Sequence, residues 1–242
     1  MSPKYFDIHS HIQFPQFSAD KDAVLKRMED EWVGAIVVGT DLKSSELAIR
    51  EAEGKDGLFA TVGLHPNDVF KEEFNATRFA ELGKHEKVVA IGECGLDYFR
   101  SREKESGIRQ KEVFEAHVSI AVELNKPLMI HCRDPLRPSG SEASAHDDLI
   151  DILKSKKKEY GEKLRGNIHF FTGTKEVAKK YFDIGFTVSF TGVLTFTHDY
   201  DEVVRYAPLN MIMSETDCPF AAPVPYRGQR NEPVYVKEVV KR

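Results

Sequence analysis

The sequence lacks the features that mark membrane and disulfide-stabilised proteins. No run approaches the roughly 18 apolar residues of a membrane-spanning helix, and residues 1–9 hold no apolar core long enough for a signal peptide. Three cysteines among 242 residues, an odd number, do not suggest a disulfide framework. We therefore predict a cytoplasmic protein with no membrane partner, and nothing in the sequence indicates an obligate protein partner.

An excess of basic charge is also lacking. The chain has 34 Lys and Arg residues against 39 Asp and Glu residues, which gives a net charge of −5. This balance argues against a general basic coat for binding nucleic acid. A polyanionic substrate is not excluded, because bound divalent cations can supply a positive field locally.

Linkers, low-complexity segments and a Gly-rich phosphate loop after the first strand are absent too. Instead, short β-branched runs alternate with segments of helical periodicity. The runs that we interpret as strands are residues 5–8, 35–38, 59–62, 88–91, 128–130, 167–171, 186–190 and 211–214. The segments that we interpret as helices are 20–32, 44–53, 108–124, 145–158, 175–182, 201–207 and, with a weaker pattern, 78–85.

Eight strands, each followed by a helix, predict an α/β fold with one closed parallel (β/α)₈ barrel, a TIM barrel, over residues 1–242. Such a barrel typically needs about 250 residues. An open doubly wound sheet is the less favoured alternative. In a barrel the chemistry lies at the carboxyl ends of the strands.

Residues with metal-binding side chains follow the predicted strands at these ends. His9 and His11 end the first strand, and residues two apart in an extended chain point to the same side. A His-x-His pair alone is weak evidence, since a histidine that donates to a backbone carbonyl in the core is common. Four further residues occupy the ends of strands four, five, six and eight: Glu93, His131, His169 and Asp217.

If the register is correct, these six side chains converge on one mouth of the barrel. Four histidines and two carboxylates suit two adjacent cations better than one. We predict that Glu93 bridges two divalent ions, with zinc, manganese and magnesium as the candidates. Each cysteine directly follows a predicted ligand, so the thiols of Cys94, Cys132 and Cys218 should point away, toward the helices.

Seven short motifs extend this pattern along nearly the whole chain. They are FDIHSH (6–11), VGLHP (62–66), IGECGLDY (91–98), HCRD (131–134), HFFTG (169–173), ETDCP (215–219) and RGQRNEP (227–233). In these motifs the chain resembles the TatD-type metal-dependent deoxyribonucleases of the amidohydrolase-like barrels. The resemblance implies hydrolysis of DNA phosphodiesters. It also implies one metal held by His9, His11, Glu93 and Asp217, and a second held by Glu93, His131 and His169.

The chain departs from these relatives in two places. Phe170 stands where many of them carry cysteine, a change that we expect on the core side and expect to be tolerated. The chain ends at Arg242, soon after Pro233 begins the last expected helix, so we expect this helix to be shortened.

These observations lead to a hypothesis of in-line hydrolysis by a metal-bridging hydroxide, with Glu93 and Asp217 as the catalytic carboxylates. Asp217 would take or position the proton, while His65, Arg133 and Arg227 would bind phosphates of the substrate in an exonuclease reaction. The candidate substrates are DNA, with single-stranded DNA among its forms, and other phosphodiesters. Aromatic platforms for the bases would come from Tyr98, Phe99, Phe196 or Tyr226.

Two other functions stay open at this point. The same metals can act on a carbonyl, as in an ester or amide hydrolase such as a D-aminoacyl-tRNA deacylase. A non-catalytic scaffold that keeps the barrel is a third interpretation, which an intact ligand set disfavours.

Overall fold

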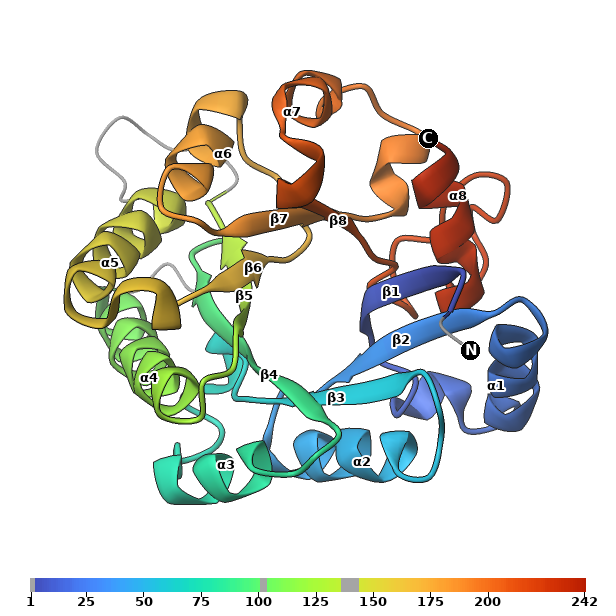
Figure 1. Ribbon diagram of the computed structural model, residues 1–242, viewed down its shortest axis with the longest axis horizontal. Helices are drawn as coiled ribbons and strands as arrows, with labels where there is room; N and C mark the ends of the chain where they lie inside the picture. The colour runs from blue at the N-terminus through green and yellow to red at the C-terminus, as the bar shows by residue number, and fades with distance from the viewer. Residues whose placement is uncertain (1–2, 101–103, 136–143) are drawn as a thin grey trace.

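A computed structural model describes residues 3–100, 104–135 and 144–242 of the chain. It contains one eight-stranded parallel sheet with the strands in sequential order, and the helices surround the ring of strands (Figure 1). The strands are β1 (Tyr5–Ser10), β2 (Val33–Val38), β3 (Leu58–Val62), β4 (Val88–Asp97), β5 (Leu128–Arg133), β6 (Gly166–Ile168), β7 (Thr187–Phe190) and β8 (Ile212–Ser214). The predicted (β/α)₈ barrel is confirmed.

The seam between the first and last strands closes just beyond β8. Ser10 and Cys218 form a parallel bridge there, the amide of Asp217 donates to the carbonyl of His9 at 2.9 Å, and the amide of His11 donates to that of Cys218 at 2.9 Å. The seam therefore fixes the residues after β1 and β8 directly against each other.

Eight α-helices of the described part cover the sheet. They are α1 (Lys21–Asp30), α2 (Leu42–Ala52), α3 (Ala76–Gly83), α4 (Lys104–Glu123), α5 (Ala145–Tyr160), α6 (Lys175–Phe182), α7 (Asp201–Tyr206) and α8 (Val236–Lys241). Side chains of Asp41, Ser144 and Thr174 cap the N-termini of α2, α5 and α6 by accepting from backbone amides of the first turn. None of the described helices is long and apolar enough to cross a membrane.

Two glycines let β4 run close to β5. Gly92 and Gly95 have φ values of 139° and 141°, and a Cβ built on them would lie 2.1 Å from the carbonyl oxygen of Met129 and 2.0 Å from that of His131. Only glycine fits at such a distance. Glu93 lies between these two glycines. Because the glycines allow the close approach, β4 stays paired with β5 through Asp97, whereas the sequence predicted that it ends at residue 91.

The sixth strand is shorter than predicted, ending at Ile168 instead of residue 171. Phe170 adopts a left-handed conformation with φ of 45°, which extended chain does not allow. Its amide donates to the Glu215 carboxylate at 2.6 Å, a contact that holds this turn. The turn directs the Phe170 side chain to the cavity described below, so the prediction that it lies on the core side is wrong.

Candidate metal centre

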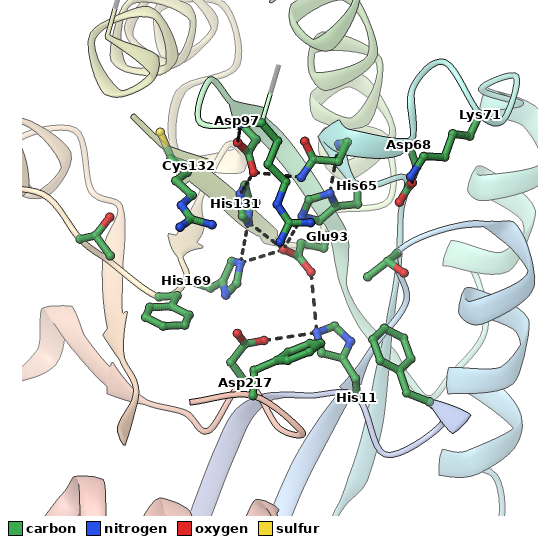
Figure 2. Close-up of a pocket in the computed structure, with 18 residues that line it drawn as sticks. His11, His65, Asp68, Lys71, Glu93, Asp97, His131, Cys132, His169 and Asp217 are labelled. Carbon is green, nitrogen blue, oxygen red and sulfur yellow. Dashed lines mark hydrogen bonds and ion pairs between the residues drawn. The ribbon is translucent and has the colours of Figure 1, made fainter. Parts of the chain in front are cut away.

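The six predicted ligands come from the carboxyl ends of five strands, and five of them, all except His9, line one mouth of the barrel (Figure 2). His9 lies just beneath them, with its Nε2 within 4 Å of both Glu93 and Asp217. His9, Glu93 and His131 belong to β1, β4 and β5, whereas His11 and His169 follow β1 and β6 directly. Asp217 lies three residues beyond β8 with φ of 54°, next to the backbone seam with His9. The structure therefore brings together all six residues.

Glu93 lies at the centre, and one of its oxygens faces a first group of donor atoms. Its Oε2 lies 3.4 Å from His9 Nε2 and 3.9 Å from His11 Nε2. Asp217 completes this group, because its Oδ1 lies 3.4 Å from His11 Nε2 and 3.8 Å from His9 Nε2. Two imidazoles and two carboxylates are a donor set that can hold one transition-metal ion.

The other oxygen of Glu93 faces a second group. Its Oε1 lies 2.8 Å from His169 Nε2, 3.0 Å from His131 Nδ1 and 3.3 Å from His65 Nε2. One carboxylate thus presents a different oxygen to each of two donor groups. This arrangement is the one that a carboxylate shared between two neighbouring cations requires.

His11 and His131 each use one ring nitrogen for a hydrogen bond outside the donor groups, so the other nitrogen points into its group. His11 Nδ1 is 2.9 Å from the carbonyl of Val38 and His131 Nε2 is 3.1 Å from Asp97 Oδ2, so these nitrogens carry the protons. The opposite nitrogens are then the atoms available to a cation, and they lie 3.2 Å from His9 Nε2 and 3.3 Å from His169 Nε2. Nitrogens that face each other so closely fit a cation between them.

The pKa values of Glu93 and His169 also indicate a centre that favours positive charge. Burial raises the pKa of Glu93, but the imidazoles of His169, His65 and His9 outweigh burial and hold this pKa well below its ordinary value. Burial lowers the pKa of His169, yet the charge of Glu93 and the contact with Glu215 raise it well above its ordinary value. Positive charge is therefore favoured next to Glu93, whether protons or cations supply it.

His65 differs from the other histidines of the second group. Its Nδ1 accepts from the backbone amide of Asn67 at 3.1 Å, and burial lowers the pKa of His65, which favours the neutral ring. The single proton of that ring is then on Nε2, the atom that faces Glu93. In this form His65 donates a hydrogen bond toward Glu93, although His65, Glu93 and His131 also lie close enough together to hold a metal. Its contact with substrate stays a prediction.

A cavity of about 550 Å³ opens over the centre. Arg133 and His65, two of the three residues predicted to bind phosphates, line it. Arg227 is not among its described lining residues, because the Arg227 guanidinium stacks 3.8 Å from the ring centroid of Phe196 and donates to the carbonyl of Ala222 at 2.9 Å. Lys71 and Arg100, which the sequence analysis did not single out, contribute two further basic groups to the lining.

The aromatic residues at the cavity also differ from those predicted. Phe14, Phe170 and Phe220 line it, and Phe220 is about half exposed. None of the four predicted platforms is among its described lining residues. The Tyr98 hydroxyl donates to Asp148, Phe99 and Phe196 stack against arginines, and Tyr226 stacks on Tyr235 at 3.8 Å.

The three cysteines are unpaired and buried, and none belongs to a group of described residues that could hold a metal. Cys132 Sγ accepts from the hydroxyl of Tyr181 on α6, and Cys94 Sγ donates to the carbonyl of Met129 on β5. The Cys132 thiol therefore packs toward a helix, as predicted.

Two carboxylates that support the centre were not identified as site residues from the sequence. Asp97 accepts from His131, and Glu215 lies behind His169 with its Oε1 3.6 Å from His169 Nδ1. Both occur in motifs that the sequence analysis quotes, IGECGLDY and ETDCP, and both are fully or almost fully buried. A buried strand-end carboxylate is costly without partners, which is the signal that could have identified them.

Comparison with known proteins agrees with this centre. The family model described as "TatD related DNase" matches residues 6–242. The chain is 39% identical to the "Uncharacterized metal-dependent hydrolase YabD" of Bacillus subtilis, covering 98% of this chain and 89% of that protein. It is 31% identical to the "3'-5' ssDNA/RNA exonuclease TatD" of Musicola paradisiaca, covering 98% and 88% respectively.

A solved structure extends the agreement to the fold. The TatD homologue YJJV of Escherichia coli superposes with a TM-score of 0.85 at 26% identity, over 100% of this chain and 89% of that one. Family match, sequence relatives and fold are consistent with the clustered histidines and Glu93. The chain belongs to the TatD family of metal-dependent hydrolases.

Proposed function

We propose that this hydrolase cleaves phosphodiester bonds at an end of single-stranded DNA with two divalent cations. The observation that carries the proposal is that the two carboxylate oxygens of Glu93 face different donor groups. Its Oε2 faces His9 and His11, and its Oε1 faces His131 and His169. The cations, when bound, act as Lewis acids on a phosphate and activate water. Imidazole-rich donors favour zinc or manganese over magnesium.

Side chains of the chain supply the remaining functions. Asp217 faces the cavity with 13% of its side chain exposed, so it can take a proton from an attacking water while it holds its cation. His65 donates from Nε2 to an oxygen of the phosphate in place of Glu93. Arg133 contributes a guanidinium, which matches phosphate oxygens in a bidentate geometry.

The shape of the cavity supports an unpaired strand as the substrate. Glu93 and His169 are 3% and 4% exposed, so the scissile phosphate must enter the cavity to reach them. A cavity of about 550 Å³ is in the size range of small-ligand pockets, with room for roughly one or two nucleotides. A base-paired duplex would have to unpair at its end to place a nucleotide there, which costs a few kcal/mol.

The basic and aromatic residues that line the cavity match the phosphates and bases of a nucleotide strand. Lys71, Arg100 and Arg133 supply positive charge for the backbone phosphates, and Phe14 and Phe220 supply flat surfaces on which bases can stack. Binding of single strands commonly combines these elements, with stacking worth about 1–3 kcal/mol per base. The relative from Musicola paradisiaca carries a name that specifies single-stranded DNA and RNA. Three unpaired cysteines also fit a reducing cytoplasm, where we place this activity.

Nucleotide release from end-labelled single-stranded and duplex DNA tests the proposal. We expect release from the single strand with added Mn²⁺, loss of release with a chelator, and slower release from the duplex. His131→Gln should abolish release, Phe220→Ala should raise KM about tenfold, and Arg227→Ala serves as the matched control because Arg227 lies outside the cavity lining. Hydrolysis of carboxyl esters or aminoacyl-tRNA without nucleotide release would contradict the proposal.

A further inference from the structure

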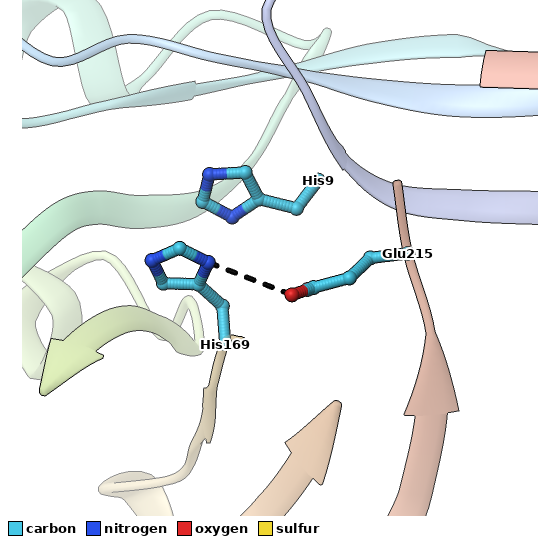
Figure 3. A group of neighbouring side chains, drawn as sticks. All are labelled: His9, His169 and Glu215. Atoms are coloured by element: carbon cyan, nitrogen blue, oxygen red, sulfur yellow. Dashed lines mark ion pairs between the residues drawn. The ribbon is translucent and has the colours of Figure 1, made fainter. Parts of the chain in front are cut away.

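The two donor groups share a contact on the side opposite Glu93. The rings of His9 and His169 stack with centroids 3.8 Å apart and planes inclined by 13° (Figure 3). His9 Nε2 belongs to the first group and His169 Nε2 to the second. The Nδ1 atom of each ring is buried and makes no hydrogen bond within the described part of the protein.

Glu215 lies next to His169 and near His9. Its Oε1 is 3.6 Å from His169 Nδ1, and one carboxylate oxygen lies within 4.8 Å of a ring nitrogen of both His9 and His169. Glu215 is fully buried, and neither Glu215 nor His9 is among the described residues that line the cavity. The carboxylate is therefore placed behind the ligands and not among the groups that substrate can touch.

Residues of two strands, β6 and β7, and of the turn after β6 hold this carboxylate in place. Its Oε1 accepts from the amide of Phe170 at 2.6 Å, and its Oε2 accepts from the hydroxyl of Ser189 at 2.7 Å. The Ser189 oxygen accepts in turn from Asn167 Nδ2 at 2.6 Å, and Asn167 Oδ1 accepts from the hydroxyl of Thr187 at 2.9 Å. With donors on both oxygens, the Glu215 side chain cannot rotate toward the cavity.

His9, His169 and Glu215 have the composition of a third metal site, but their surroundings favour another role. Each Glu215 oxygen already accepts from an N–H or O–H group, and Glu215 and His9 are buried outside the cavity lining. A cation there would meet the positive ends of these donors. A carboxylate behind a metal-ligating histidine commonly accepts the proton of the nitrogen that does not bind the metal.

We infer that Glu215 is a positioning residue shared by both metal sites. It favours protons on Nδ1 of His169 and His9, so the Nε2 lone pairs of both rings face the cations. Glu215 thus links the geometry of the two sites from outside the cavity lining, as Glu93 links them through its two oxygens. The inference rests on the proposed pair of cations and is independent of the substrate.

Titration of the metal-free chain with Mn²⁺, followed by calorimetry, tests the inference without a substrate. Glu215→Gln keeps the shape of the side chain, and we expect it to weaken both binding steps by about 10–100-fold. Glu232→Gln is the matched control: Glu232 is also a buried carboxylate, paired with Arg27 and Arg230 and touching no predicted ligand. It should lower thermal stability and leave both affinities unchanged.

Two results would overturn the inference. Glu215→Gln could reduce thermal stability with unchanged affinities, which is the behaviour of a structural residue, or it could weaken one step only. If Glu215→Gln does not fold, Ser189→Ala decides, because it keeps the carboxylate and removes one of the two donors that fix it. Unchanged affinities in that variant overturn the inference.

Two further readouts make the result specific. In nitrogen-15 spectra of the protein loaded with diamagnetic Zn²⁺, we expect Nδ1–H signals from His9 and His169 that shift in Glu215→Gln and not in Glu232→Gln. Two-step binding of Mn²⁺ without any nucleotide release would refute the proposed function while leaving this role of Glu215 intact.

Discussion

Asp97→Asn is a selective perturbation of one metal group. In the wild type, Asp97 Oδ1 accepts from the amides of Phe99 and Arg100 at 3.0 Å each, while Oδ2 accepts from Asn67 Nδ2 at 2.9 Å and His131 Nε2 at 3.1 Å. An asparagine has only one acceptor oxygen. Whichever way its amide turns, two of these donors face an NH₂ group.

Two magnitudes follow from this loss. Leaving a buried donor unpaired costs about 1–3 kcal/mol, so we expect the free energy of unfolding to fall by at least that amount. Loss of the carboxylate that accepts from His131 should lower the affinity of the second donor group for its cation by about 10–100-fold, or about 1.4–2.7 kcal/mol. The first group should keep its affinity, because Asp97 contacts neither His9 nor His11.

Calorimetric titration with Mn²⁺ measures the two affinities separately. Asp68→Asn is the control, since Asp68 also lines the cavity but its carboxylate pairs with Lys71 at 2.7 Å and with no predicted ligand. Equal weakening of both steps, or no weakening of either, would refute the assigned hydrogen bond from His131 to Asp97.

Acid stability provides a second measurement on the same variant. Burial raises the pKa of Asp97, but hydrogen bonds from His131, Arg100 and Asn67 outweigh burial and lower it below its ordinary value. A carboxylate with a lowered folded-state pKa stabilises the protein above its unfolded pKa of about 3.9 and loses this contribution as pH falls through the folded pKa. The difference in unfolding free energy between wild type and Asp97→Asn should therefore shrink below about pH 4.

Three further predictions concern the barrel and its histidines. Gly95→Ala should cost about 3 kcal/mol or more in urea unfolding, because its Cβ would meet the His131 carbonyl; a wild-type midpoint would contradict this. Phe171→Ala, at a side chain that is 1% exposed, should cost about 3–5 kcal/mol by the same assay. Mn²⁺ affinity should increase from pH 6 to pH 8, since His131 and His169 have raised pKa values and must lose protons to bind; a flat profile would refute this.

In the metal-free protein, raising the pH has the opposite effect through His131 and His169: it lowers the stability of the fold. A histidine with a raised folded-state pKa stabilises the fold below its unfolded pKa of about 6.5 and loses this contribution as pH rises through the folded pKa. Protons and cations thus compete for the same nitrogen lone pairs, and raising the pH exchanges one for the other.

The sequence predicts the convergence of the ligands because parallel strands of a barrel end at one rim. His9, Glu93 and His131 need only the alternation of an extended chain and a strand boundary correct to a few residues. Asp217 and Phe170 adopt left-handed conformations that no sequence period signals. Their side-chain directions depend on tertiary contacts, the seam to His9 and the Glu215 carboxylate.

Residues on loops were harder to predict. Lys71 and Arg100 lie beyond β3 and β4 in segments without periodicity, so nothing local places them at the cavity. Arg227 belongs to a conspicuous motif, yet its guanidinium packs on Phe196. The sequence indicates which residue types are available near the strand ends, whereas loop conformation decides which of them reach the substrate.

Glu93 is the residue on which the proposed pair of cations depends most, so metal stoichiometry of the Glu93→Ala variant is the sharpest test. We expect two equivalents of Mn²⁺ per wild-type chain and a loss of affinity at both steps in the variant, because each oxygen of Glu93 faces one donor group. A variant that retains one step at wild-type affinity, or a wild type that binds a single ion, would refute the proposed pair.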